Sequence, residues 1–500
     1  MEVKTGLLTI IFLLFLLSPQ IASARERPDG DVDASCSINI MDLAAVGLCF
    51  GCECGQPCWG SCEQADVYPG CDINIFDLAT VGVNYGERCR IYGLDFSPYV
   101  GGGTPPSPVS ESKIRELMDV VAPYTQWIRS YSALNGIERI PYAAKDAGLN
   151  VAMGAWIDGV QSTNDQEIAN LVSAVEDGMV DIAVVGNEVL QGQLTDEASL
   201  IYNINKVKQD LADAGLPGIP VTTPEAYEVL FNRYNNGSLM HQALIDACDV
   251  IFVSYYPFWK EVNISDSLAA VHAWHQDVLS VIGSKPVYVA ETGWPDDTDT
   301  AGTCIRETSA ENAATYFLGF VSWAEANDVP YFYFETFDED YKDEPCQAGD
   351  SSQGVGPHWG IWDRNKQLKA SMQDVFDGLN ATENWVGQPE IELTYVPPIG
   401  SFDDLEGRIH HASALSHRVS VYIKVGSGWW TKPTFTNPLT YIWMDGEWAC
   451  DITTGGIDEQ ATDIAAFLVP IGYVPPQVSN SPSLPDELFN NSVAHIIVSR

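Results

Sequence analysis

The sequence predicts an α/β protein: a (β/α)8 TIM barrel in the middle, a small helical module before it and a β-sandwich domain after it. Three observations lead to this prediction. Strand-like apolar runs alternate with helical patterns over residues 91–382, which favours a parallel barrel over a doubly wound sheet. Eight of the twelve cysteines crowd into residues 36–89, and an alternating apolar pattern follows a proline-containing linker near the end of the chain. Because 500 residues exceed what one core can hold, several domains are expected.

The first residues have the features of a signal peptide. Lys4 precedes an apolar run over residues 7–17, and Ala22-Ser23-Ala24 offers small residues for cleavage. The run is short for a membrane span, so residues 1–24 are expected to be removed. The sequence therefore predicts a secreted protein, extracellular or associated with a cell surface, that has no membrane contact after cleavage.

Charge and cysteine content narrow the range of partners. The chain has 25 Lys+Arg against 68 Asp+Glu, a net charge of −43, which argues against nucleic acid and anionic membranes as partners. A neutral polymer, calcium, or an exterior adapted to acid or salt remains compatible with this charge. The cysteine content agrees with an oxidising compartment, in which Cys304 and Cys346 could pair.

Residues 28–90 contain an internal repeat with the spacing of a calcium-binding loop. Oxygen-bearing side chains recur through two twelve-residue loops, each followed by a Leu-Ala-x-Val-Gly helix start. The candidate ligands are Asp31, Asp33, Ser35, Asn39 and Asp42 in the first loop, and Asp66, Asp72, Asn74 and Asp77 in the second. At loop position 6, where glycine is usual, the chain has Cys36 and Cys71, so calcium binding by the second loop is left open.

The duplicated loop and helix resemble a dockerin-type repeat. That resemblance implies Ca²⁺ in the loops and a cohesin-like or cell-surface docking partner. The alternative interpretation is a disulfide-linked spacer whose acidic residues are only solvated.

Eight barrel strands are predicted between residues 91 and 334. Their ranges are 91–96, 126–129, 151–156, 182–187, 219–223, 250–254, 286–290 and 331–334. Helical patterns separate them, and Asn164-x-x-Glu167 is predicted to be a capping box at one helix start. Because the carboxyl ends of barrel strands open onto one face, polar residues at those ends are candidates for a site.

Residues 391–500 are predicted to form a β-sandwich after a linker at 383–398. The segment 419–425 alternates strictly between apolar and polar residues. Four tryptophans, Trp429, Trp430, Trp443 and Trp448, could each fill a small β core or stack on a sugar face. The segment resembles β-rich accessory domains of secreted polysaccharide-acting enzymes.

Two glutamates stand where predicted strands end. Glu188 follows strand 182–187, and Glu291 follows strand 286–290. Acetal hydrolysis needs one carboxyl group to protonate the leaving oxygen and a second to meet the oxocarbenium-like centre. Asn187 precedes Glu188 and is suited to hold a sugar hydroxyl. The sequence therefore predicts a polysaccharide-cleaving carboxyl pair that needs no cofactor for catalysis.

Several short motifs, in a consistent order, resemble glycoside hydrolase family 17. They are Ile128-Arg-Ser-Tyr131, Val185-Gly-Asn-Glu188-Val-Leu, Pro220-Val-Thr-Thr-Pro-Glu225, Tyr256-Pro-Phe-Trp259, Val289-Ala-Glu291-Thr-Gly-Trp-Pro and Phe334-Glu-Thr-Phe-Asp-Glu-Asp-Tyr-Lys342. Members of that family are (β/α)8 retaining β-1,3-glucanases and related glucanosyltransferases. The resemblance thus implies β-glucan as the substrate and a covalent glycosyl-enzyme intermediate.

The same resemblance implies roles for individual residues. Glu188 would be the acid/base and Glu291 the nucleophile, with their carboxyl groups about 5–5.5 Å apart. Tyr256 would hydrogen-bond the nucleophile, Glu335 would raise the pKa of the acid, and Trp294 would be the first choice for a sugar platform. The expected substrate-binding residues are Tyr99, Arg129, Tyr131, Asn187, Tyr256, Trp259, Trp294, Glu335, Glu339 and Lys342.

Two alternatives use the same residues. A β-1,3-glucanosyltransferase differs only in whether sugar or water enters the acceptor site. A non-catalytic glucan-binding surface protein would keep the barrel as a receptor, although a receptor does not need both carboxylates.

Overall fold

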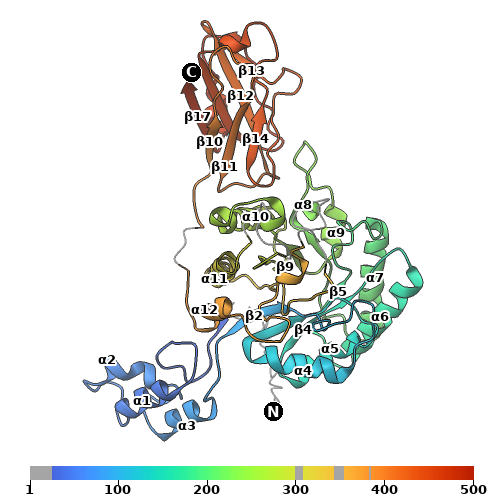
Figure 1. The fold of residues 1–500 in the computed structure, drawn as a ribbon, viewed down its shortest axis with the longest axis vertical. Coiled ribbons are helices and arrows are strands. Elements are labelled where there is room, and N and C mark those ends of the chain that lie inside the picture. The colour runs from blue at the N-terminus through green and yellow to red at the C-terminus, as the bar shows by residue number, and fades with distance from the viewer. Residues whose placement is uncertain (1–24, 299–307, 343–353, 382–384) are drawn as a thin grey trace, which may run out of the picture.

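The computed structural model describes residues 25–298, 308–342, 354–381 and 385–500. The predicted signal peptide at residues 1–24 and the predicted pairing of Cys304 with Cys346 lie outside these residues. Within them, every helix is too short or too polar to cross a bilayer. Figure 1 shows a small helical part, a central α/β part and a β-rich part that contains the C-terminus.

The helical part is a small core held by disulfides. Its elements are α1 (Ile40–Cys49), α2 (Trp59–Cys62) and α3 (Ile75–Val83). Four disulfides link Cys36 to Cys89, Cys49 to Cys62, Cys52 to Cys58 and Cys54 to Cys71. Asn39 caps α1 and Asn74 caps α3, each in a capping box with the aspartate three residues later. So small a core commonly needs such covalent links to remain folded.

The central part is a mixed α/β fold whose sheet is parallel. The strands are β2 (Arg90–Asp95), β3 (Thr125–Arg129), β4 (Asn150–Ala155), β5 (Ile182–Val185), β6 (Val221–Thr222), β7 (Pro224–Ala226), β8 (Ile251–Ser254) and β9 (Val287–Glu291). β2 to β6 pair in sequence order, and so do β7 to β9, all in parallel. The two-residue β1 (Arg25–Glu26) adds an antiparallel edge to β2.

Five predicted strands match the observed ones to within one residue at each end, and three differ by more, each for a local reason. β5 ends at Val185 because Gly186 takes φ +85°. The strand predicted at 219–223 is interrupted after Thr222, two residues before Pro224, which has no N–H for the ladder. Segment 331–334 forms two isolated parallel bridges, Tyr331 with Val289 and Tyr333 with Leu94, because its amides alternate between two neighbouring strands.

Helices surround the central sheet (Figure 1). They are α4 (Glu111–Val121), α5 (Ile140–Asp146), α6 (Gln161–Glu176), α7 (Glu197–Asp213), α8 (Tyr227–Leu230), α9 (Gln242–Ala247), α10 (Ser267–Val281), α11 (Ala310–Ala326) and α12 (Gln373–Phe376). The capping box predicted at Asn164 and Glu167 is wrong, since α6 begins at Gln161 after Val160. Glu167 is buried instead and accepts the backbone N–H groups of Ala133 and Trp156.

The C-terminal part consists of two antiparallel sheets. One contains β10 (Glu390–Tyr395), β11 (Leu405–His410) and β14 (Glu447–Cys450); the other contains β16 (Ser479–Ser481), β13 (Gly428–Lys432), β12 (His417–Val425), β15 (Asp463–Pro470) and β17 (Ala494–Ser499). One apolar cluster draws residues from both sheets. Trp448 and Trp429 are buried in cores, whereas Trp430 is half-buried and Trp443 is exposed.

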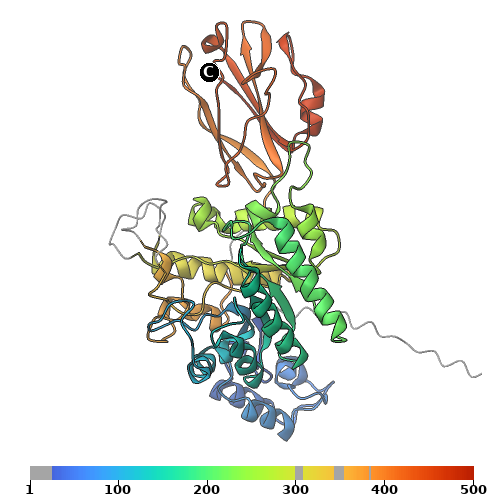
Figure 2. The same ribbon diagram turned by 90° about the vertical axis from the view of Figure 1, so that its right-hand side faces the viewer.

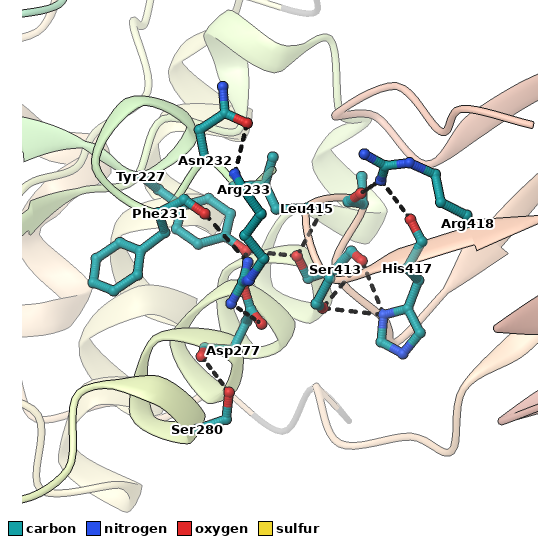
Figure 3. Close-up of polar contacts among 12 residues, drawn as sticks. Tyr227, Phe231, Asn232, Arg233, Asp277, Ser280, Ser413, Leu415, His417 and Arg418 are labelled. Atoms are coloured by element: carbon teal, nitrogen blue, oxygen red, sulfur yellow. Dashed lines mark hydrogen bonds and ion pairs between the residues drawn. The ribbon is translucent and has the colours of Figure 1, made fainter. Parts of the chain in front are cut away.

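The C-terminal part packs against the end of the central part that contains α8 and α10 (Figures 1 and 2). Figure 3 shows the buried polar contacts at this junction. Arg233 donates two hydrogen bonds to Asp277 of α10, both at 2.8 Å. The Tyr227 hydroxyl lies 2.7 Å from Asp277 and 2.5 Å from the hydroxyl of Ser413, which belongs to the C-terminal part. A serine from one part thus completes a hydrogen-bond network of the other.

Candidate active site

Charged side chains gather where the parallel strands of the central sheet end. Asp95, Arg129 and Glu291 are the last residues of β2, β3 and β9. Glu188 follows β5, and Glu225 lies within the short β7. Strands that run in parallel present their carboxyl ends on one face, so residues far apart in sequence meet there.

Arg129 connects three of the polar groups at this face. Its Nη1 donates to Asp95 at 2.7 Å and to Glu291 Oε1 at 2.9 Å, and its Nη2 donates to the side-chain oxygen of Asn187. Its guanidinium also lies over the Tyr131 ring, 4.7 Å from the centroid. Because Arg129 is 0% exposed, it holds other side chains in place and cannot itself contact a sugar, contrary to the expectation from the sequence.

Glu291 is held by a donor on each carboxylate oxygen. Oε1 accepts from Arg129, and Oε2 accepts from the Tyr256 hydroxyl at 2.8 Å, the contact that the family resemblance implied. Burial and the charge of Glu291 raise the pKa of Tyr256 far above its ordinary value, so its hydroxyl stays protonated and donates. These two donors fix the orientation of the Glu291 carboxylate. The residue is 5% exposed.

Glu188 has the properties of a proton donor. Burial, and then the nearby charges of Glu291, Glu225 and Glu228, raise the pKa of Glu188 to about 8, with Arg129 acting in the opposite direction. Its Oε1 is buried and has no hydrogen-bond partner among the described residues. From the sequence, Glu335 is a candidate for a like charge that raises this pKa; in the structure burial comes first, followed by the charges of Glu291, Glu225 and Glu228. A carboxyl group that stays protonated near neutral pH can give its proton to a leaving oxygen.

A second charged cluster surrounds Lys342. Its ammonium contacts Glu335 and lies 3.1 Å from Glu339 Oε2, and both carboxyl groups are buried. Glu339 Oε1 also accepts from the Ser97 hydroxyl and from the Tyr99 backbone N–H, the latter at 3.1 Å. Burial would lower the pKa of Lys342, but the charges of Glu335 and Glu339 raise it. Tyr99, Glu335 and Glu339 are thus buried supports of this face, and Lys342 is half-buried.

The predicted sugar platforms have different surroundings. Trp294, the preferred candidate, is 2% exposed and packs against Phe258 and Tyr316, which leaves no ring face open for stacking. Trp259 is half-buried and lies 5.5 Å, centroid to centroid, from the buried Trp359. Trp259 is therefore the better candidate for contact with a sugar. Tyr131 is also half-buried, and the Arg129 guanidinium lies over its ring.

Two residues of the site were missed from the sequence. Asp95 ends β2 as Glu291 ends β9, so the strand-end argument applies to it equally. Burial and the charge of Glu291 raise the pKa of Asp95 to about 8, although Arg129 lies beside it. Glu225 is the last residue of the family motif at 220–225, but nothing in the local sequence pattern distinguishes it from a solvated glutamate.

The two predicted calcium loops differ in how their ligands are arranged. In the first, one carboxylate oxygen each from Asp31, Asp33 and Asp42 lie within 4.8 Å of one another, which suits a hard cation. Asp42 also accepts the Val32 backbone N–H, at 2.8 Å, and Ser35 donates its backbone N–H to Asp31.

In the second loop, the side chains of Asp66, Asp77 and Asn74 accept backbone N–H groups of the loop or of α3. The Asp72 carboxylate accepts a hydrogen bond from the Asn74 side-chain amide. In the first loop, the Asn39 side chain accepts the Met41 N–H and so caps α1, as Asn74 caps α3. Cys36 and Cys71 at position 6 take φ of 59° and 63°, the left-handed conformation for which glycine is usual.

Comparison with known proteins places residues 93–360 in a family model described as the BtgE/BtgC glycoside hydrolase domain. Glucan 1,3-beta-glucosidase BGL2 of Candida albicans is 25% identical over 279 residues, which cover 52% of this chain and 86% of that protein. The probable beta-glucosidase btgE of Aspergillus fumigatus is 30% identical over 278 residues, which cover 54% of this chain and 45% of that protein. A glycoside hydrolase family 17 beta-1,3-glucanosyltransferase from Rhizomucor miehei is 24% identical with a TM-score of 0.46, covering 56% of this chain and 96% of that one.

Proposed function

Because the chain belongs to the BtgE/BtgC glycoside hydrolase domain family, we propose that it hydrolyses β-1,3-glucan with retention of configuration at the anomeric carbon. The observation that carries this proposal is the contrast between two neighbouring glutamates. Glu291 has two hydrogen-bond donors on its carboxylate, whereas the pKa of Glu188 is raised to about 8. A carboxyl group that retains its proton, beside a second one held by two hydrogen-bond donors, matches what the acid and the nucleophile of this reaction require.

In the proposed reaction, a Glu291 oxygen attacks the anomeric carbon and forms a covalent ester with the sugar. The bond to the leaving sugar breaks, and its oxygen takes the proton of Glu188. Water then attacks the same carbon, gives a proton to Glu188 and releases Glu291 as a carboxylate. Arg129 and Tyr256 hold Glu291 in line for both steps, and Asn187, oriented by Arg129, is placed beside the acid.

The experiment is to incubate the secreted protein with laminarin-type β-1,3-glucan and to follow product length and anomeric configuration by NMR. Retained configuration in shortened products is expected, and Glu291→Ala is expected to abolish cleavage. Glu176→Ala, exposed at the end of α6, is the matched control and should cleave normally. Products longer than the substrate would instead identify a glucanosyltransferase. Binding without cleavage by the unaltered protein would favour a glucan-binding surface protein.

We also propose that the central strands close into one (β/α)8 barrel, which spans residues 91–382. One residue, Thr223, separates the end of β6 from the start of β7, so the two sheets meet there. On the other side, Tyr331 bridges β9 and Tyr333 bridges β2. These pairings support a continuous ring. Residues 28–90 and 391–500 are the proposed accessory domains, a docking module and a β-sandwich.

The docking role of residues 28–90 is supported by apolar residues that the fold leaves in solvent. Equivalent positions of the two repeats are exposed and apolar: Ile40 and Ile75, Met41 and Phe76, Leu48 and Val83. Contiguous exposed apolar surface is typical of protein–protein contact sites. A cohesin-like or cell-surface partner is therefore proposed, with Ca²⁺ held by Asp31, Asp33 and Asp42 in the first loop.

A further inference from the structure

Glu225 lies beneath the turn that follows Glu188. It is completely buried in β7. Its Oε1 accepts the Leu190 backbone N–H at 2.7 Å, and its Oε2 accepts the Gln191 backbone N–H at 3.3 Å. One carboxyl group from a neighbouring strand therefore holds two consecutive amides of the turn.

This turn needs external support because its backbone is strained. Glu188 has φ +46°, a left-handed conformation that is unfavourable for a residue other than glycine. Gly186 precedes it at φ +85°, where an added Cβ would meet Val189 at 2.5 Å. The turn closes through the Gly192 N–H, which donates to the Glu188 carbonyl oxygen at 2.7 Å.

β7 holds both sides of Glu188. The Glu188 N–H donates to the carbonyl oxygen of Pro224 at 3.0 Å, and the next residue of that strand, Glu225, binds the turn beyond Glu188. Movement of the Glu225 carboxyl group would therefore change where the Glu188 side chain points.

Glu225 also acts on Glu188 through charge. The groups that face Glu188 are Glu291 of β9, Glu225 of β7 and Glu228 of α8, which disfavour its ionisation, and Arg129 of β3, which favours it. Burial raises the pKa of Glu225 to about 7, although the amides of the turn oppose this. When Glu225 is ionised, its negative charge disfavours ionisation of Glu188.

We infer that Glu225 is a positioning residue for the acid/base step: it fixes the strained turn that carries Glu188, and its charge opposes loss of the Glu188 proton. The inference rests on the proposed function and goes beyond it, since Glu225 touches neither the reacting atoms nor Glu291.

The test compares Glu225→Gln with Glu167→Gln on two substrates. Glu167 is a matched control, because it is also buried and accepts two backbone N–H groups, but it is not among the groups that face Glu188. Laminarin needs its leaving oxygen protonated, whereas a 2,4-dinitrophenyl β-laminaribioside does not. Glu225→Gln is expected to lower kcat/KM on laminarin by about 10-fold to 100-fold, to spare the dinitrophenyl substrate, and to move the basic limb of the pH profile to lower pH. Glu167→Gln should leave the substrate ratio and the limb unchanged.

Equal losses on both substrates with an unmoved basic limb would overturn the inference and leave Glu225 a purely structural residue. If the unaltered protein cleaves neither substrate, the proposed function itself is wrong, so the two failures are distinguishable. Should Glu225→Gln not fold, Glu225→Asp decides the question, because it keeps the charge on a shorter arm. For Glu225→Asp, a loss of activity on laminarin alone, with the basic limb of the pH profile unchanged because the charge is kept, supports the inference. An equal loss on both substrates overturns it.

Discussion

At the scale of single residues, the centre of the site is one cation among several acids. Arg129 is paired with Asp95 and Glu291 and hydrogen-bonded to Asn187, all within a buried setting. The pKa of Asp95 is raised to about 8 by burial and by Glu291. One guanidinium thus shares its charge between two carboxyl groups, only one of which is needed as a carboxylate.

Replacing Arg129 with methionine would test this balance. Arg129→Met keeps most of the volume but leaves Asp95 and Glu291 buried without their cation, so the free energy of unfolding should fall by about 3–5 kcal/mol. Urea denaturation measures the change. Arg115→Met on the exposed face of α4 is the control and should change the free energy of unfolding little. Similar losses for both variants would contradict the assigned role of Arg129.

At the scale of elements, the duplicated loops show how equal sequence spacing leads to unequal sites. Both loops end in the same capping box, because Asn39 and Asp42 are matched by Asn74 and Asp77. Three aspartates converge only in the first loop, among the residues that the structure describes. The repeat therefore preserves the helix starts while the cation geometry differs.

We expect calcium to protect the 28–90 segment from proteolysis through the first loop. Asp42→Ala removes one of the three converging carboxylates and should abolish the calcium effect. Asp77→Ala removes the equivalent capping-box aspartate of α3, at a comparable cost in helix stability, and should keep the calcium effect. Limited proteolysis with calcium and with a chelator distinguishes them, and loss of the effect in both variants, or in neither, would refute the assignment.

At the scale of the whole molecule, the junction in Figure 3 sets a buried ion pair of the central part, Arg233 with Asp277, beside Ser413 of the C-terminal part. Arg233→Ala leaves the Asp277 carboxylate buried and unpaired, so the free energy of unfolding should fall by about 3–5 kcal/mol. Scanning calorimetry measures the loss. Arg364→Ala, which removes an exposed arginine paired with the exposed Asp340, is the control and should change little. An equal or larger effect at Arg364 would contradict the role assigned to the buried pair.

Stability should decline as pH rises from about 4.5 to about 8. The pKa values of Asp95 and Glu188 are raised to about 8 and that of Glu225 to about 7, in each case chiefly by burial. The folded state therefore holds protons that the unfolded chain releases near pH 4, and this stabilisation is complete below the unfolded pKa and lost as pH passes the folded one. Thermal midpoints at about pH 5 and about pH 8 test this, and Glu188→Gln should reduce the difference. A higher midpoint at about pH 8 would contradict it.

The sequence by itself was sufficient for features that depend on local patterns. Apolar runs located the strands of the central sheet, and the cysteine cluster marked the small module, because side-chain periodicity and spacing are local properties. The strand-end position of Glu188 and Glu291 followed from the same periodicity. The predicted helix start was wrong: Asn164 and Glu167 have the spacing of a capping box, but α6 begins three residues earlier, at Gln161.

Only the tertiary structure decided which side chains surround those glutamates. Glu225 and Asp95 belong to the site because separate strands converge on one face, and Trp294 does not present a ring face because Phe258 and Tyr316 cover it. The protonation of Glu188 likewise depends on burial and on charges from four other elements, β3, β7, β9 and α8. A pKa is set by everything packed around a group, and no local pattern contains that information.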